Sequence, residues 1–174
     1  MPPLTISDPS LVVLVGPAGS GKTTFAARHF AQDEILSSDT MRAIVGRDES
    51  DQGATRAAFA LLHRQLARRL VDGKLTVVDA TNVEGHARRA LLRRALAAGV
   101  PAIAIVFDLP PHVVLRRNEE RRARVVDGDI VRRHLALLRA TVDRGVIDGE
   151  GFDDVYRIRD PAELDSTTIE RRLG

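Results

Sequence analysis

The segment GPAGSGKT, at Gly16–Thr23, constrains the fold of this chain more than any other feature. It follows the uninterrupted apolar run Leu11–Val15 and opens Lys22–Phe30, a stretch whose pattern is helical. A strand, a glycine-rich turn and a helix in this order form a loop that cradles phosphate groups with backbone N–H groups. The sequence therefore predicts a nucleoside triphosphate site on an α/β fold.

The residues of this loop have distinct predicted roles. Glycine is needed where a side chain would block the approach of a phosphate. We expect the Lys22 ammonium to contact the β- and γ-phosphates and the Thr23 hydroxyl to bind Mg²⁺. A nucleoside triphosphate and Mg²⁺ are therefore the predicted ligands of this loop, with nucleotide contacts from Gly16, Gly19, Ser20, Gly21, Lys22, Thr23 and Thr24. Kinases, GTPase switches and motor ATPases all use such loops, so the motif leaves the reaction open.

The rest of the chain alternates short apolar runs with longer amphipathic segments. Five runs are strand-like: Leu11–Val15, Glu34–Leu36, Leu75–Val78, Ala102–Phe107 and Val155–Ile158. Five segments are helix-like: Lys22–Phe30, Ala54–Val71, Glu84–Ala98, Pro111–Ala123 and Asp129–Arg144. Apolar strands that alternate with helices indicate a parallel sheet covered on both faces. We predict an α/β fold with a central parallel sheet, and a single domain over residues 1–174.

Composition sets further limits. The 174-residue chain is 44% hydrophobic, enough for a sizeable core, and it has no cysteine, which excludes disulfides and thiolate sites. No apolar run is long enough to cross a membrane and the first nine residues lack a signal-peptide pattern, so we expect a cytoplasmic protein without a membrane partner. Arginine clusters at His86–Arg94 and Arg116–Arg133 are compatible with phosphate binding, although composition alone favours solvated helix faces.

Asp39 and Arg42 follow the second predicted strand. Strand ends of this kind face the ligand crevice of a parallel sheet, where Asp39 can accept the proton of an attacking hydroxyl. Arg42, three residues on, lies on the same face of a short helix and can hold a phosphate beside that hydroxyl. The alternative is that Asp39 only caps a helix that starts at Thr40. The segment by itself does not decide between the two interpretations.

Asp79 ends the third apolar run, LTVVD. A carboxylate at this position orients water on Mg²⁺ in nucleotide-binding folds of this type. We therefore predict Thr23 and Asp79 as the metal site. Short apolar runs that end in aspartate are common, so this feature supports the glycine-rich loop and does not stand alone.

Three arginines recur at helical spacing after the fourth strand. Arg117, Arg121 and Arg124 are four and seven residues apart, so a helix would project them from one face. Guanidinium groups on one face suit a lid that neutralises charge on a transferring phosphoryl group. Arg116 and Arg122 interrupt that face, and the spacing alone favours a solvated surface.

Four ordered motifs together resemble the kinase module of bacterial polynucleotide kinase-phosphatases of RNA repair: GPAGSGKTTFA, SSDxxR at Ser37–Arg42, GKLTVVDATN at Gly73–Asn82, and RNxxRxxR at Arg117–Arg124. The resemblance runs from about Leu11 to Tyr156. It implies a P-loop kinase α/β/α sandwich with a helical arginine lid at about residues 111–144. It also implies transfer of the γ-phosphate of ATP to the 5′-hydroxyl of RNA or DNA.

The resemblance assigns roles residue by residue. Lys22 and Thr23 match the ATP and Mg²⁺ residues, and Asp39 matches the general base for the 5′-hydroxyl. Arg42 matches the residue that binds the phosphate on the 3′ side of the attacking nucleotide. The lid arginines that contact the ATP phosphates correspond to Arg117 and Arg121, with Arg124 beside them. Proteins of this family carry phosphatase and ligase modules downstream, so modules of a longer parent chain are possible partners.

Two other functions are compatible with parts of the pattern. A P-loop kinase for a nucleoside, sugar or antibiotic would share every feature except a groove for a strand. A GTP-dependent switch is disfavoured because the N-K-x-D guanine-reading motif is missing and Asp39 would have no role. Aromatic residues make up only 3% of the chain, which argues against base stacking and for recognition through phosphates and apolar contacts.

Overall fold

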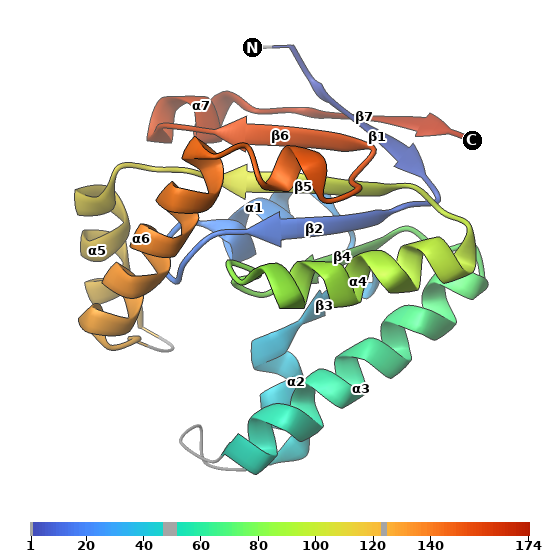
Figure 1. Ribbon diagram of the computed structural model, residues 1–174, viewed down its shortest axis with the longest axis horizontal. Helices are drawn as coiled ribbons and strands as arrows, with labels where there is room; N and C mark the ends of the chain where they lie inside the picture. Colours follow the sequence, from blue (N-terminus) through green and yellow to red (C-terminus); the bar gives the residue numbers. More distant parts are fainter. Residues whose placement is uncertain (1, 47–51, 123–124) are drawn as a thin grey trace.

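The computed structural model describes residues 2–46, 52–122 and 125–174, and its centre is a five-stranded parallel sheet (Figure 1). The strand order is β3-β4-β2-β5-β6. The strands are β2 (Leu11–Val15), β3 (Ile35–Ser37), β4 (Thr76–Asp79), β5 (Ala102–Phe107) and β6 (Asp154–Ile158). The predicted strands and the predicted α/β class are therefore confirmed, with ends that differ by at most one residue.

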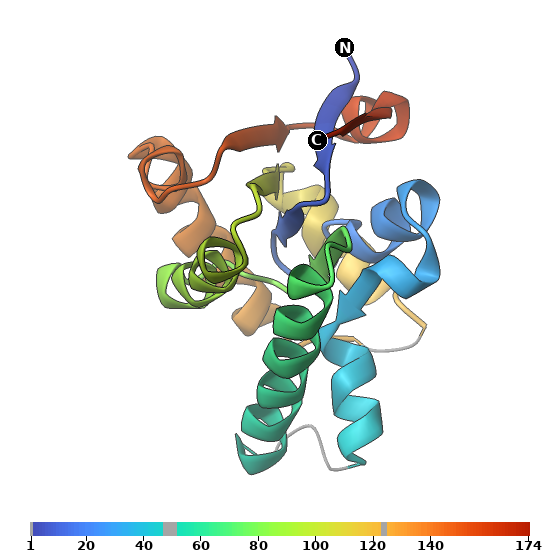
Figure 2. The same cartoon turned by 90° about the vertical axis from the view of Figure 1, so that its right-hand side faces the viewer.

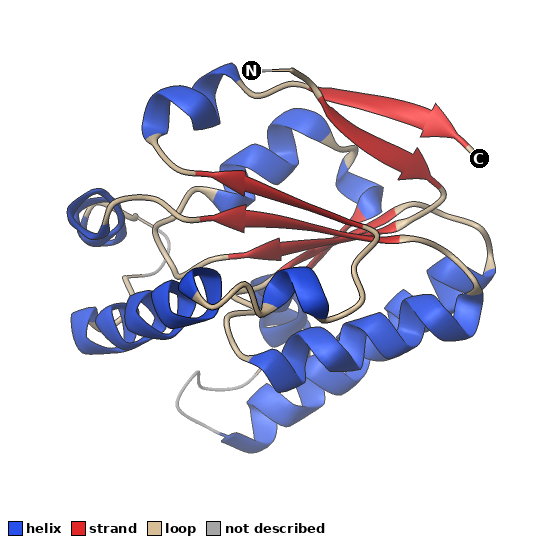
Figure 3. Ribbon diagram, turned by 45° about the horizontal axis from the view of Figure 1, so that its top comes forward, coloured by secondary structure: helices blue, strands red, loops and turns tan. Residues whose placement is uncertain are grey.

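Helices cover both faces of this sheet (Figure 3). Because side chains alternate along a strand, β2 sends Leu11, Val13 and Val15 to one face and Val12 and Leu14 to the other. The first face packs on α3 (Gln52–Val71) and α4 (Gly85–Ala98). The second packs on α1 (Lys22–His29), α7 (Pro161–Ser166) and β1 (Leu4–Asp8). Buried residues of β2, β4 and β5 belong to both layers, which explains their near-continuous apolar sequences.

Three of the remaining helices follow the carboxyl ends of strands: α2 (Ser38–Val45) follows β3, and α5 (Pro111–Glu119) and then α6 (Gly128–Asp143) follow β5. The short helices η1 (Gln32–Glu34) and η2 (Ile147–Gly149) precede β3 and β6. Helices α2 and α3 lie together and project from the sheet on one side, and α5 and α6 lie on the other (Figures 1 and 2). Among the described residues, no helix is both long and apolar enough to span a membrane.

Two strands lie outside the sequence prediction. β1 pairs in parallel with β7 (Ile169–Leu173), from Leu4 opposite Ile169 to Asp8 opposite Leu173. The sequence of β7, IERRL, is polar and largely exposed, so it lacks the apolar pattern that marks a buried strand. Its partner comes from the opposite end of the chain, and no local signal reports such a pairing.

Several predicted helix ends were wrong. The predicted helix Pro111–Ala123 ends at Glu119 in α5. The predicted helix Asp129–Arg144 starts at Gly128 and ends at Asp143 in α6, and Asp127 caps it by accepting a hydrogen bond from the Asp129 N–H. Helix α2 starts at Ser38, not Thr40.

Candidate active site

A cavity of about 560 Å³ lies at the carboxyl ends of β2, β3 and β4. This is the usual volume of a small-molecule site, and the position is the one expected for an open parallel sheet. Its walls come from the glycine-rich loop, from α2 and from the lid region between α5 and α6. The predicted site residues that line it are Gly19, Gly21, Lys22, Thr23, Thr24, Asp39, Arg42, Asp79, Arg117 and Arg121.

Two glycines of the loop have backbone conformations that residues with side chains rarely adopt. Gly19 and Gly21 have φ angles of +85° and +91°. A Cβ on Gly19 would also lie 2.5 Å from the Val114 carbonyl oxygen, so the loop packs directly on α5. Gly16 and Ser20 do not line the cavity. The Ser20 hydroxyl donates to the Pro17 carbonyl at 2.7 Å and shapes the loop from behind, so nucleotide contacts from Gly16 and Ser20 stay a prediction.

Lys22 is buried, with 7% of its surface exposed. Its ammonium donates to the Pro17 carbonyl at 2.8 Å and to the Ser20 hydroxyl at 3.3 Å. The pKa of Lys22 is lowered from 10.5 to about 8, chiefly by burial and also by Arg121, against the opposing effect of Asp79 and Asp39. A buried cation with two neutral partners suits a polyanionic ligand, which would restore the lost solvation.

We expect nucleotide affinity to fall as pH rises above about 8. The free protein loses the Lys22 proton there, whereas bound phosphates favour the ammonium and raise its pKa, so binding takes up a proton. Between pH 8 and 9.5 the dissociation constant of a non-hydrolysable ATP analogue should rise by up to about 15-fold, approaching tenfold for each pH unit well above the pKa. Titration calorimetry in buffers of different ionisation enthalpy measures the proton uptake. Lys22→Arg, which does not titrate, should bind with flat pH dependence, and an equally flat wild type would contradict the role of Lys22.

Thr23 and Asp79 meet on the cavity floor. The Thr23 hydroxyl donates to Asp79 Oδ2 at 2.8 Å, although the two residues are 56 positions apart. Asp79 is buried and belongs to β4, beside β2 in the sheet. A hydroxyl and a carboxylate in this position fit Mg²⁺, which takes few protein ligands and keeps water and phosphate oxygens. No group of three or more histidine or acidic side chains that could hold a metal ion was found among the described residues.

Asp39 and Arg42 lie side by side on α2. Arg42 Nη1 donates to Asp39 Oδ1 at 3.0 Å and lies 3.4 Å from the Ser38 hydroxyl. The cap of this helix is Ser37, whose hydroxyl accepts from the Thr40 N–H. The interpretation of Asp39 as a mere helix cap is therefore wrong. Its carboxylate borders the cavity and is half exposed, so it is accessible to a ligand.

Two arginines of the lid region, one in α5 and one after it, lie at the cavity. Arg117 lies in the last turn of α5, and Arg121 lies beyond the end of that helix, so the predicted single helical face was wrong. Both nevertheless line the cavity, and Arg121 Nη2 lies 4.0 Å from Asp39 Oδ2. The buried Asn118 side chain exchanges two hydrogen bonds with the backbone of Val126, at 2.7 and 3.1 Å, and holds the loop ends together. Arg124 lies outside the described residues, and its contact with nucleotide stays a prediction.

A buried ion pair fixes the loop between β4 and α4. Arg88, only 1% exposed, donates through two nitrogens to Glu150, both at 2.7 Å. Its third nitrogen donates to the carbonyls of Asn82 and Val83 at 3.0 and 2.8 Å. The Asn82 amide in turn donates to the Leu14 carbonyl at 2.8 Å. This chain of contacts joins the cavity floor to η2.

Comparison with known proteins supports a nucleotide-binding assignment. Residues 11–144 match a family model described as an AAA domain. This chain belongs to that AAA-domain family. No curated protein matched the sequence.

Solved structures share the fold at low sequence identity. A chain of the Pnkp1/Rnl/Hen1 RNA repair complex aligns with a TM-score of 0.69 and 21% identity, over 79% of this chain but 46% of that one. An unliganded sugar kinase from a Janibacter species aligns over 90% of both chains, with a TM-score of 0.56 and 21% identity. The Mycobacterium tuberculosis APS kinase CysC, in complex with AMPPNP and APS, aligns over 94% of this chain and 93% of its own, with a TM-score of 0.57 and 16% identity. These likenesses confirm the predicted P-loop kinase fold, and this chain spans less than half of the RNA repair chain.

Some cavity residues were missed by the sequence analysis of this AAA-domain chain. Phe59 comes from α3, Ile130 and His134 come from α6, and Leu164 comes from α7. Burial and, to a smaller extent, the neighbouring Arg133 lower the pKa of His134 from its usual value. Each sits in an amphipathic segment whose pattern gives no sign that one turn of the helix faces a ligand. The low aromatic content of the chain argued against an aromatic side chain at the acceptor site, but Phe59 lines the cavity.

Proposed function

We propose that this protein is a polynucleotide 5′-kinase that transfers the γ-phosphate of ATP to the 5′-hydroxyl end of RNA or DNA, in RNA repair. The observation that carries the proposal is the pairing of Asp39 and Arg42 on one wall of the cavity, opposite the glycine-rich loop. The Asp39 carboxylate can accept the proton of the acceptor hydroxyl, and the Arg42 guanidinium can bind a phosphate close to that hydroxyl. A nucleotide at a 5′ end presents both in this arrangement.

The residues divide the chemistry between them. Lys22 and the backbone of Gly19 and Gly21 would hold the β- and γ-phosphates, with Thr24 beside them. Thr23 and Asp79 would hold Mg²⁺, which when bound neutralises charge on the phosphate oxygens. Arg117 and Arg121 would stabilise the transferring phosphoryl group from the opposite side.

Asp39 would act on the acceptor. Its carboxylate takes the proton of the 5′-hydroxyl as that oxygen bonds to the γ-phosphorus, and the bond between the γ-phosphorus and the β,γ-bridging oxygen breaks. The products are a 5′-phosphorylated end and ADP. Arg42 Nη1 and Arg121 Nη2 lie 3.0 and 4.0 Å from the two oxygens of this carboxylate and would hold it in place beside the acceptor.

A kinase for a small-molecule hydroxyl is the second candidate. It is favoured by the sugar kinase and the APS kinase, which align with this chain over nearly their full lengths. A small acceptor can lie wholly inside the cavity, whereas a strand needs an exit from it.

Transfer of labelled γ-phosphate separates the two candidates. The protein, Mg²⁺ and labelled ATP are incubated with a 5′-hydroxyl oligonucleotide, a nucleoside 3′-phosphate, a free nucleoside and a set of sugars. Label on the oligonucleotide and the nucleoside 3′-phosphate supports the proposal. Label on a sugar or a free nucleoside alone would replace it with the small-molecule kinase.

Arg42→Ala gives a sharper prediction within the same assay. If Arg42 holds the phosphate on the 3′ side, its loss should raise KM for a nucleoside 3′-phosphate by about tenfold or more, since a charge-assisted hydrogen bond contributes about 1.5–3 kcal/mol. A free nucleoside has no such phosphate and should lose much less. Equal losses on both acceptors would contradict the phosphate contact and leave Arg42 only as the partner of Asp39.

A further inference from the structure

Helices α3 and α4 carry an uneven share of the charge of this chain. Together they contain eight arginines and no aspartate or glutamate. The whole chain has 26 basic and 24 acidic residues, so the rest of it has 18 basic and 24 acidic residues. The positive charge of the protein is therefore concentrated on two helices that pack against each other on one face of the sheet.

Six of these eight arginines are available to a ligand. Arg69 is engaged with Leu75 and Thr76, and Arg88 with Glu150. The other six are exposed, and within the described part of the chain none of them forms an ion pair. We call this group the α3–α4 basic face: Arg56, Arg64, Arg68, Arg89, Arg93 and Arg94.

Some arginines elsewhere on the surface form ion pairs, whereas others, such as Arg144 and Arg159, form none in the described part of the chain. Arg132 pairs with Asp129 at 3.3 Å, and Arg171 pairs with Glu34 at 2.7 Å. A general preference of the chain for arginine accounts for the number of arginines on α3 and α4. It does not account for the removal of every acid from two adjacent helices, because acids outnumber basic residues over the remaining chain.

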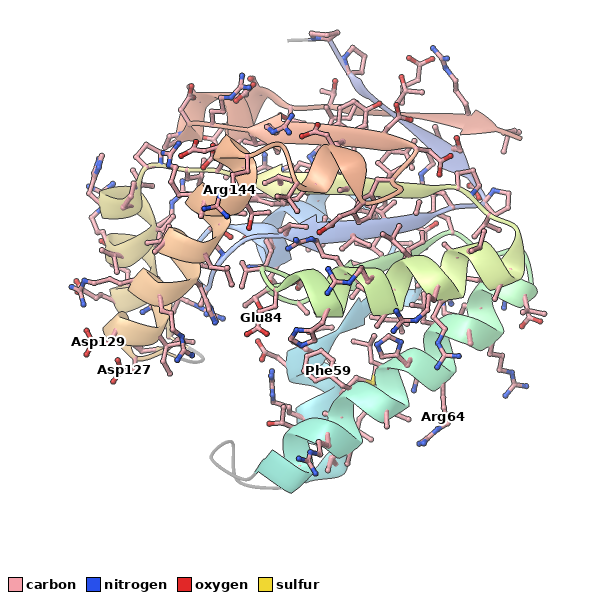
Figure 4. All side chains as sticks on the ribbon, in the orientation of Figure 1. Phe59, Arg64, Glu84, Asp127, Asp129 and Arg144 are labelled. Atoms are coloured by element: carbon pink, nitrogen blue, oxygen red, sulfur yellow. The ribbon has the colours of Figure 1, made fainter. Side chains whose placement is uncertain are left out.

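The α3–α4 basic face begins where the acceptor side of the cavity ends. The Arg42 guanidinium lies 5.7 Å from the ring of Phe59, which lines the cavity from α3. His63 follows one turn further along α3, and Arg94 and Arg93 of α4 act on it, lowering a pKa that burial has already reduced. Figure 4 shows Phe59 at the cavity end of α3 and Arg64 further along that helix.

We propose that the α3–α4 basic face binds the sugar-phosphate backbone of the acceptor strand beyond its first nucleotide. This rests on the proposed function, since it extends the acceptor site from Arg42 past Phe59. The distance from Phe59 to Arg68 is roughly 14 Å along the helix, enough for more than one phosphate. Exposed guanidinium groups without competing acids bind phosphates strongly and without sequence preference. A small-molecule acceptor would not reach this face.

Length dependence of the acceptor tests the proposal. A triple variant, Arg64→Gln with Arg68→Gln and Arg93→Gln, is compared with a control triple that removes the same charge elsewhere: Arg144→Gln, Arg159→Gln and Arg172→Gln. The three control arginines are exposed, and Figure 4 shows Arg144 on the side of the molecule away from Arg64. KM is measured for a nucleoside 3′-phosphate and for a single strand of about twelve nucleotides at several salt concentrations.

The wild type and the control triple should favour the longer acceptor by about tenfold or more at low salt. In the α3–α4 triple this advantage should largely disappear. The slope of log affinity against log salt should also fall by about 2, since each phosphate contact with a single strand contributes about 0.7. An unchanged length advantage, or an equal loss in the control triple, would overturn the proposal.

Direct binding keeps this test separate from the proposed function. If no acceptor is phosphorylated, the proposed function fails, and fluorescence anisotropy of the same labelled strand still tests the face. Salt-sensitive binding that is lost only in the α3–α4 triple would support the face. Binding of poly-glutamate but not of the strand would assign the face to an acidic protein and overturn the proposal.

Discussion

Replacing Asp39 with asparagine should lower kcat for phosphoryl transfer by about 10³-fold, within the range of 10²–10⁴ that general base catalysis contributes. Asparagine keeps the size of the side chain but cannot take the proton of the acceptor hydroxyl. The nucleotide side of the cavity, with Lys22, Thr23 and Asp79, stays intact. ATP affinity, measured by titration calorimetry, should therefore change by less than about threefold.

The chain offers a matched control for this variant. Asp129 also stands in the first turn of a helix and also pairs with an arginine three residues on, Arg132, at 3.3 Å. It lies outside the cavity, so Asp129→Asn should retain wild-type kcat. An Asp39→Asn enzyme with near wild-type kcat would remove Asp39 from the chemistry and direct attention to His134, another group in the cavity that could accept a proton.

Replacing Arg88 with alanine should lower the free energy of unfolding by about 3–5 kcal/mol, the usual loss when one partner of a buried ion pair is removed. Glu150 would remain as a buried carboxylate without its two hydrogen bonds, and the carbonyls of Asn82 and Val83 would lose their shared donor. For a chain of this length the melting temperature should fall by about 10 °C. Denaturant unfolding and calorimetry measure both quantities.

Two further variants serve as controls for the stability loss of Arg88→Ala. Arg132→Ala removes an exposed pair and should lower stability by less than about 1 kcal/mol. Combining Arg88→Met with Glu150→Met removes both buried charges, and the double variant should be more stable than Arg88→Ala. A loss below 1 kcal/mol for Arg88→Ala would mean that water reaches Glu150 and that the loop between β4 and α4 does not depend on the pair.

Local sequence patterns were enough to predict the glycine-rich loop, most of the central sheet and the position of the Asp39–Arg42 pair. The glycine-rich loop could be predicted because its function requires particular residue types at fixed spacing between a strand and a helix. The three central strands β2, β4 and β5 could be predicted because strands buried on both faces are apolar almost without interruption. Asp39 and Arg42 are three residues apart in one short helix, so their pairing at 3.0 Å follows from helix geometry alone.

The tertiary structure alone decided the contacts between segments that are distant in the sequence. The sequence shows no link between Arg88 and Glu150, 62 residues apart, or between β1 and β7 at opposite ends of the chain. The sequence pattern also predicted too long a helix at α5. In the structure Asn118 forms hydrogen bonds with the backbone of Val126, and these fix the loop after α5 that brings Arg121 to Asp39. Phe59 reads as one more apolar helix residue, and only the packing of α2 on α3 turns it towards Arg42. Such contacts depend on where the folded chain places each helix, and local periodicity carries no information about that placement.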